Sequence, residues 1–189
     1  MANANLQFRL ATPEDAPQIQ QLIQAAFRSD DSRPNWTADP VLNARYTISV
    51  DTVLDGITSP DKELLVVTDA NGTDGAAIVA TVGVAKAGAD LARIYNLALD
   101  QRYQRGGLGR QVLTHAEDYC RREWGVKKTG LNALSPRQEL ISWYMRRGYV
   151  KTGTSPFPAQ ATEGMGLPEM WFVELEKDLD TALIGDAAI

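Results

Sequence analysis

Apolar and polar positions alternate over Leu6–Leu10, and this period of two predicts a first β-strand. Thr12 and Pro13 follow, with two acidic residues directly after them, which is typical of a helix start. Apolar residues then recur at helical spacing as far as Phe27. The first part of the chain is therefore predicted to be a strand followed by an amphipathic helix.

The next patterns predict a loop, a second helix and three strands. Arg28–Pro40 is polar and broken by prolines, whereas a broad apolar stripe runs from Leu42 to Ile57. Three β-rich runs follow, separated by clusters of glycine, asparagine and aspartate such as Asn71–Gly75, and they predict an antiparallel meander. The runs are Glu63–Thr68, Ala76–Val84 and Ala92–Leu99.

After Leu99 the pattern changes to a glycine-rich loop and a strong helix from about Leu108 to Trp124. A strand, a helix and two final strands are predicted at Lys128–Leu134, Arg137–Arg147, Tyr149–Gly153 and Met170–Glu176. The strand–helix–strand unit in this half favours one parallel strand pair. Together the patterns predict a mixed α/β (α+β) sheet with four main helices, in one domain over residues 1–189 with a core at about 6–177.

Composition excludes several classes of function. The formal net charge of -5 at pH 7 argues against a nucleic-acid-binding domain, which normally carries a basic patch. A single cysteine, Cys120, and a single histidine, His115, lead us to expect no disulfide and no metal site. There is no signal-peptide pattern and no apolar run of roughly 20 residues. We therefore expect no membrane contact and a cytoplasmic location.

The glycine-rich loop Gln104–Gly109 stands between the strand ending at Leu99 and the helix. A helix N-terminus carries unpaired N–H groups and about half a positive charge. Glycines let the backbone wrap closely, so successive N–H groups can converge on an anion, and Arg102, Arg105 and Arg110 add positive charge. The loop predicts a site for a phosphorylated ligand; a turn that merely requires glycine is the alternative.

Two other phosphate-binding motifs match this loop poorly. A Walker loop ends in Gly-Lys-Ser/Thr, whereas Gly109 is followed by Arg110 and Gln111. A dinucleotide fingerprint requires a third glycine and an acidic residue about 20 positions later, where this chain has Thr129.

With its flanks, the loop resembles the acetyl-CoA-binding signature of the GNAT acetyltransferase superfamily. The matching residues are Gln104, Gly107 and Gly109, preceded by Leu97-Ala98-Leu99 and followed by an amphipathic helix. The order of elements also matches, so the resemblance covers about Leu6–Lys177. It implies a GNAT-like mixed sheet with a splayed central strand pair.

The resemblance also implies acetyl-CoA as cosubstrate and a site built mainly from backbone. The bulged, splayed strand would bind the pantetheine arm through Leu97, Ala98 and Leu99, and the pyrophosphate would bind to Gln104, Arg105, Gly106, Gly107, Leu108, Gly109 and Arg110. An asparagine that the family often carries at the start of its last helix has no clear equivalent in Ser135-Pro136-Arg137.

The run Trp143–Tyr149 is similar to the segment that ends the family's last helix, in which a tyrosine is the general acid in many members. This implies that Tyr144 faces the sulfur of CoA. A phenol pKa near 10 keeps the hydroxyl protonated at neutral pH, and helical spacing with Leu140 and Ile141 points it inward. The alternative is a core tyrosine with a local hydrogen-bond partner.

No covalent nucleophile is required when both substrates bind together. Cys120 falls on the apolar stripe of its helix and is expected to be a buried structural thiol. His115 lies beside that stripe and is expected to be a packing or surface residue. Two candidates remain for the general base that takes the proton from the amine. Tyr95 and Asn96 could order a water that relays the proton, or Glu163 could accept it directly.

The sequence therefore predicts an N-acetyltransferase that moves the acetyl group of acetyl-CoA to a primary amine, of a small molecule in the first instance, in a ternary complex. Acetylation of a protein N-terminus or lysine is an alternative, since Arg28–Pro40 and Ser155–Pro168 could wall a long cleft. A non-catalytic acyl-CoA-binding module is another. Trp36, Trp143 and Pro156-Phe157-Pro158 are candidates for lining the acceptor pocket. A homodimer is also left open.

Overall fold

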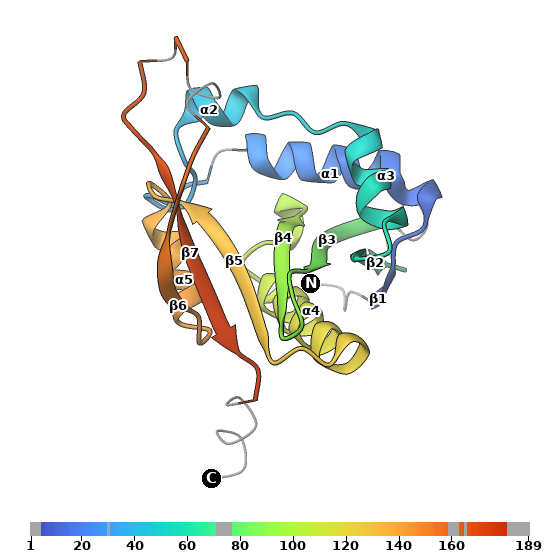
Figure 1. Cartoon of the computed structure of the whole chain (residues 1–189). Coiled ribbons are helices and arrows are strands. Elements are labelled where there is room, and N and C mark those ends of the chain that lie inside the picture. Colours follow the sequence, from blue (N-terminus) through green and yellow to red (C-terminus); the bar gives the residue numbers. More distant parts are fainter. Residues whose placement is uncertain (1–4, 30, 71–76, 159–162, 165, 181–189) are drawn as a thin grey trace.

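The computed structural model describes residues 5–29, 31–70, 77–158, 163–164 and 166–180, which fold around a seven-stranded sheet of order β1-β2-β3-β4-β5-β7-β6 (Figure 1). The strands are β1 (Leu6–Leu10), β2 (Lys62–Asp69), β3 (Ala77–Lys86), β4 (Leu91–Leu99), β5 (Lys128–Leu134), β6 (Val150–Pro156) and β7 (Trp171–Asp178). The helices are α1 (Ala16–Arg28), α2 (Pro40–Arg45), α3 (Val50–Thr58), α4 (Leu108–Trp124) and α5 (Gln138–Met145), with 3-10 turns η1 (Pro13–Asp15) and η2 (Gln101–Tyr103).

β4 and β5 form the parallel pair that the sequence predicted, and they separate soon after they meet. Their pairing joins Leu91–Arg93 to Lys128–Gly130 and then stops, whereas every other neighbouring pair in the sheet is antiparallel. At the base of this splay, Arg93 Nη1 lies 2.9 Å from Glu174 Oε2 on β7. A Cβ on Gly130 would stand 3.3 Å from that Nη1, so the glycine leaves room for the arginine. The splayed central pair is confirmed.

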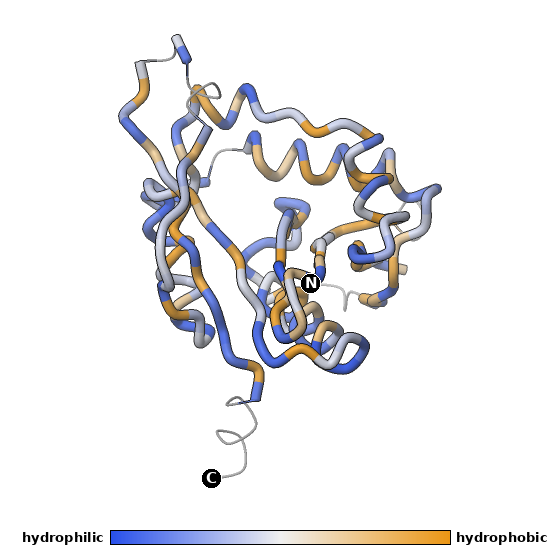
Figure 2. The backbone as a smooth tube through the Cα atoms, viewed as in Figure 1, coloured by the Kyte–Doolittle hydropathy of each residue, from blue (hydrophilic) through white to orange (hydrophobic). Residues whose placement is uncertain are grey.

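Each face of the sheet carries its own apolar core. α4 and α5 pack on one face, and α1 and α3 pack on the other (Figure 1). Along β2, Leu65 and Val67 belong to the core on the α4 side, whereas Leu64 and Val66 belong to the core beneath α1 and α3, as a period of two requires. Figure 2 shows apolar and polar positions interspersed along α1, whose buried residues Ala16, Ile19 and Ile23 recur at helical spacing. None of the helices in the described residues has the length and apolar character of a membrane span.

β4 is bulged as well as splayed. Its register with β3 shifts opposite Val82, and Asn96 takes a left-handed conformation there, with φ of 50°. Tyr95 before this point and Ala98 after it both join the core beneath α1 and α3, which an unbroken alternation would not allow. The bulge thus turns the end of β4 relative to its start.

The single helix predicted from Leu42 to Ile57 is wrong, because α2 and α3 are separate helices. Ser49 begins a new helix by accepting a 3.1 Å hydrogen bond from the Thr52 N–H. Tyr46, between the two helices, stacks on Phe27 of α1 with ring centroids 4.6 Å apart. A new cap and a tertiary aromatic contact therefore interrupt a continuous apolar stripe, and the described part of the chain has five α-helices rather than four.

The other predicted elements are confirmed to within a few residues. β1 and α4 both have the predicted bounds. The turn predicted at Asn71–Gly75 lies outside the described residues.

Candidate functional site

The loop before α4 leaves a row of backbone donors without internal partners. Arg105 and Gly107 both adopt positive φ, 64° and 84°, so the chain turns twice through the left-handed region before the helix begins. No backbone N–H from Arg105 to Gly109 donates a hydrogen bond to any residue that the structure describes. The next two N–H groups, of Arg110 and Gln111, bond to the Gly107 oxygen. Five successive donors at the positive end of a 17-residue helix can therefore bind an anion.

Three segments that are distant in the sequence meet beside this loop. A Cβ placed on Gly109 in the first turn of α4 would lie 3.7 Å from both Leu99, at the end of β4, and Trp143 of α5. Because Gly109 has no side chain, α4 can approach both elements closely. The splayed strand, the glycine-rich loop and the helix that carries Tyr144 are thus brought together.

The Tyr144 side chain is buried among aromatic rings, and its hydroxyl is free of hydrogen bonds to the described residues. The residue is 8% exposed, and its ring packs edge-on against Trp143 and Tyr149, with centroids 5.0 and 5.7 Å apart. Its hydroxyl has no hydrogen-bond partner among the described residues. Burial raises the pKa of this phenol, although Arg137 and Arg147 act in the opposite direction. The group is therefore a neutral proton donor across the physiological pH range.

The segment between α1 and α2 is tied to both sides of the site. Ser32 Oγ accepts a hydrogen bond from the Arg105 guanidinium of the glycine-rich loop. The Trp36 carbonyl accepts one of 3.0 Å from Arg137 Nε at the start of α5, and the Trp36 ring meets Trp143 edge-on at 6.2 Å. The hollow between the segment and the glycine-rich loop is lined by Asp31, Ser32, Gln101, Gln104 and Arg105.

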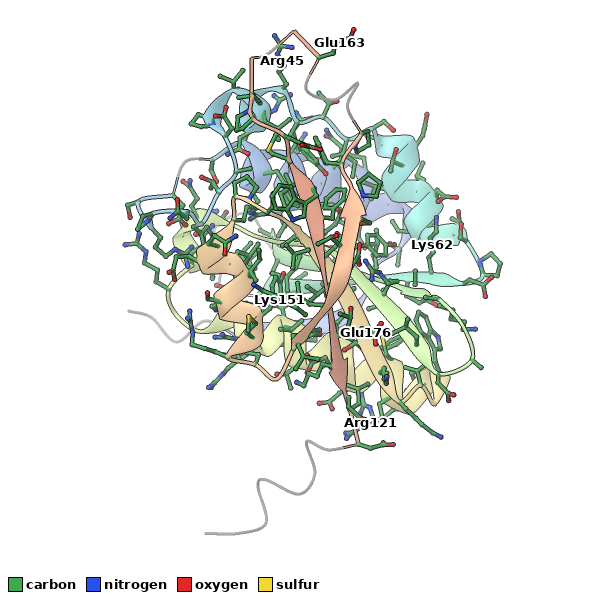
Figure 3. All side chains as sticks on the ribbon, turned by 60° about the vertical axis from the view of Figure 1, so that its left-hand side comes forward. Arg45, Lys62, Arg121, Lys151, Glu163 and Glu176 are labelled. Atoms are coloured by element: carbon green, nitrogen blue, oxygen red, sulfur yellow. The ribbon has the colours of Figure 1, made fainter. Side chains whose placement is uncertain are left out.

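The residues considered as the base do not converge on Tyr144. Tyr95 belongs to the core beneath α1 and α3, on the opposite face of the sheet, and its hydroxyl is buried without a partner. Burial raises the pKa of Tyr95 to about 12. Asn96 lies at the bulge of β4. Glu163 stands at the outer tip of the connection between β6 and β7 and points away from the sheet (Figure 3).

Cys120 and His115 have the packing environments predicted for them. Cys120 is fully buried, and burial raises the pKa of its thiol to about 12, so no thiolate nucleophile forms near neutral pH. The His115 ring lies against Phe8 with centroids 4.6 Å apart, and burial lowers its pKa. Within the described residues, no three acidic, histidine or cysteine side chains gather as a metal site requires.

Sequence reasoning missed two arginines around α5. The Arg147 guanidinium stacks on Trp143, with Cζ 3.6 Å from the ring centroid, and its Nη1 donates a 2.7 Å hydrogen bond to the Trp143 oxygen. The signal for this pair was present, because residues four apart share a helix face. Arg137 had no such local signal, since its partner Trp36 is 101 residues away in the chain.

Comparison with known families gives one match to this chain. A family model described as the acetyltransferase (GNAT) family matches residues 18–149. No curated protein gives a significant sequence match.

Solved structures with a similar fold include three N-acetyltransferases or related proteins. The ribosomal-protein-S18-alanine N-acetyltransferase from Escherichia coli is 18% identical with a TM-score of 0.66, covering 92% of this chain and 93% of that chain. Spermidine/spermine N-acetyltransferase SpeG from Vibrio cholerae is 16% identical with a TM-score of 0.66, covering 96% of each chain. Ard1 from Thermoplasma volcanium is 18% identical with a TM-score of 0.66, covering 92% and 97%. At these identities the likeness establishes the fold.

Proposed function

The chain belongs to the acetyltransferase (GNAT) family and is an acyltransferase, and from this premise we propose that it transfers the acetyl group of acetyl-CoA to the primary amine of a small molecule. Both substrates bind together in this proposal, and the amine attacks directly. The whole chain, with its core at about 6–177, acts as one domain.

The observation that carries the proposal is the row of N–H groups from Arg105 to Gly109 without internal acceptors. A pyrophosphate fits this row, because backbone donors at a helix start hold phosphate oxygens without a basic side chain. On its β5 side, β4 has no strand partner beyond Arg93, so the peptide groups of Leu97, Ala98 and Leu99 are available to an extended pantetheine arm. When bound there, acetyl-CoA supplies the activated acyl group.

Tyr144 serves as the general acid in this proposal. The amine nitrogen forms a bond to the acetyl carbon, the carbon–sulfur bond breaks, and the phenol donates its proton to the departing sulfur. The proton released from the new amide nitrogen then restores the phenol through solvent. An amine of pKa near 10 must first become neutral, which costs about 4 kcal/mol at pH 7. Positioning both substrates offsets part of the barrier.

Binding of acetyl-CoA is the first test, and the two glycines that flank α4 provide a matched pair of variants. Gly107 and Gly125 flank the helix at φ of 84° and 65°, and neither position has an atom within 4 Å of an added Cβ. Valine at either position is strained by about 1–2 kcal/mol. We expect Gly107→Val to weaken acetyl-CoA binding about 10-fold, because it shifts the row of donors. Gly125→Val should leave the affinity unchanged. Isothermal titration measures both, and absence of binding by the unmodified protein would falsify the proposal.

An acceptor screen tests the small-molecule assignment. The segment between α1 and α2 is tied to the glycine-rich loop through Ser32 and to α5 through Trp36, which favours a compact acceptor over an extended peptide. We expect release of free CoA thiol with at least one amine from a panel of polyamines, aromatic amines and amino acids. Turnover with alanine-initiated or lysine-containing peptides alone would assign a protein acceptor instead.

A further inference from the structure

A carboxylate at the base of the splay receives side chains from three other strands. Glu174 of β7 accepts at Oε1 a 2.6 Å hydrogen bond from Ser155 Oγ of β6 and a longer one, 3.4 Å, from Asn132 Nδ2 of β5. Its other oxygen, Oε2, lies 2.9 Å from Arg93 Nη1 of β4. One carboxylate therefore connects four neighbouring strands of the sheet. These four residues form the Glu174 clamp.

Arg93 reaches Glu174 by crossing β5. In the sheet β5 stands between β4 and β7, and the last pair of residues between β4 and β5 is Arg93 with Gly130. A Cβ on Gly130 would lie 3.3 Å from Arg93 Nη1 and 3.6 Å from its Cδ, so the arginine side chain lies over the glycine. Glu174 pairs with Asn132, two residues further into the splay than Gly130. The guanidinium thus bridges β4 to β7 at the level where the pairing of β4 with β5 ends.

On its β3 side, β4 is held by Tyr95, which points to the same face of the sheet as Arg93. A Cβ on Gly83 of β3 would lie 2.3 Å from Tyr95 Cζ, and one on Gly56 of α3 would lie 3.2 Å from the Tyr95 hydroxyl oxygen. The ring therefore occupies space that side chains at the two glycine positions would take. Side-chain contacts thus hold both edges of β4 directly before its bulge at Asn96.

The clamp carboxylate is ionised, and its acceptor positions are largely filled. Burial acts to raise the pKa of Glu174, but hydrogen bonds from Ser155 and Arg93 outweigh burial and lower it. Its donors take most of the roughly four positions at which a carboxylate accepts hydrogen bonds. Such a group is a poor proton acceptor and a firm connection between strands.

We propose that the Glu174 clamp sets the angle at which β4 leaves β5, and that Arg93 and Glu174 are positioning residues for acetyl transfer. This inference rests on the proposed function, in which the pantetheine arm lies along Leu97–Leu99. Leu97 is four residues beyond Arg93, about 13 Å along the strand, so a rotation of about 4° at the clamp displaces it by about 1 Å. A misplacement of about 1 Å can lower a rate by roughly 10²-fold. The pyrophosphate donors lie in a different element, the loop before α4, and keep their positions.

Loss of the clamp is expected to lower kcat without a matching loss of acetyl-CoA affinity. Glu174→Ala should lower kcat, measured from initial rates of thiol release, about 10-fold or more, and change the affinity measured by isothermal titration less than about 3-fold. Arg93→Ala should have the same effect, and the double variant should lose no more than either single one, because the two side chains act as one connection. Glu174→Gln should keep kcat within about 3-fold of the unmodified enzyme, since its amide oxygen still accepts from Arg93.

Glu176 provides a charge-matched control on the same strand (Figure 3). Its Oε2 lies 3.7 Å from Lys128 Nζ of β5, a strand with which β7 is already paired, so this ion pair does not cross the splay. Glu176→Ala changes the net charge by the same amount as Glu174→Ala and should leave kcat unchanged.

Two glycines test the clamp without removing a charge. Gly130→Ala places a methyl group against Arg93 and should lower kcat about 3-fold or more. Gly153→Ala, at the β6 position paired with Glu174, meets no atom within 4 Å and should leave kcat unchanged. This pair makes the same comparison if Glu174→Ala does not fold.

The outcomes separate this inference from the proposed function. An unchanged kcat in Glu174→Ala, or in Gly130→Ala if the former does not fold, overturns the inference. So does an equal loss of kcat in Glu176→Ala, or a loss of acetyl-CoA affinity as large as the loss of kcat. Failure of the unmodified protein to bind acetyl-CoA overturns the proposed function itself.

Discussion

Replacing Tyr144 with phenylalanine is expected to lower kcat by about 10²-fold or more, with little change in acetyl-CoA affinity. The phenylalanine ring keeps the edge-on contacts with Trp143 and Tyr149, so the packing of α5 is preserved. What is lost is a hydroxyl that has no hydrogen-bond partner among the described residues and would protonate the departing sulfur. Initial rates of thiol release, measured with the best amine from the acceptor screen, give the comparison.

Tyr149→Phe is the matched control for this substitution. Tyr149 packs against Tyr144, but its hydroxyl donates to Glu117 Oε1 at 2.9 Å and lies 3.1 Å from Thr129 Oγ1. Its loss should lower stability and leave kcat of the folded enzyme nearly unchanged. If both variants retain full turnover, or both lose it equally, the general-acid assignment is wrong.

The pH dependence of the unmodified enzyme provides a second readout for Tyr144. Burial raises the pKa of this phenol above its ordinary value of 10, and the donor form exists below that pKa. We therefore expect no fall in kcat from loss of the acid between pH 7 and 10. A fall centred below pH 9 in the unmodified enzyme, absent from Tyr144→Phe, would contradict a raised pKa.

Replacing Glu117 with alanine is expected to lower the free energy of unfolding by about 3–5 kcal/mol. Glu117 of α4 accepts hydrogen bonds from Tyr149 and from Lys177 Nζ, the latter at 2.6 Å. The Glu117 and Lys177 side chains are only 6% and 16% exposed. Removing the carboxylate leaves a largely buried ammonium and a buried phenol without their acceptor. Urea unfolding followed by circular dichroism measures the change.

Glu123→Ala, at an exposed position of the same helix, should change stability by no more than about 0.5 kcal/mol. The double variant Glu117→Leu, Lys177→Met removes both charges and should recover much of the loss. A loss below about 1 kcal/mol in Glu117→Ala would show that the buried pair does not hold α4 against β7.

Much of the fold could be predicted because its signals are local. β1 and α4 were placed by the spacing of apolar residues, and the turn into α4 by its glycines, since a residue at φ of 84° favours glycine whatever surrounds it. The break between α2 and α3 was missed for the opposite reason. Tyr46 leaves the helix to stack on Phe27, a partner in another element that no window of sequence around Tyr46 contains.

The residues of the candidate site likewise divide into those that a local sequence pattern predicts and those that depend on distant contacts. The glycine-rich loop, the strand before it and Tyr144 were found from the sequence, because phosphate binding at a helix start and the run that ends α5 are both contiguous patterns. The surroundings of the Tyr95 side chain could not be predicted from the sequence. A bulge at Asn96 decides which face of the sheet each side chain of β4 joins, and Tyr95 lies under α3 as a result.

The sequence by itself determined that a helix begins at Leu108, directly after a glycine-rich loop. Both features follow from neighbouring residues, because glycine favours the left-handed conformation of the loop and apolar spacing marks the helix. Only the tertiary structure decided that Trp143 comes next to Gly109, that Arg137 reaches Trp36, and that Arg105 reaches Ser32. Each of these contacts joins segments brought together by the packing of α4 and α5 on one face of the sheet and by the path of the segment after α1. Such contacts depend on the packing of distant elements, which no local pattern of apolar and polar residues encodes.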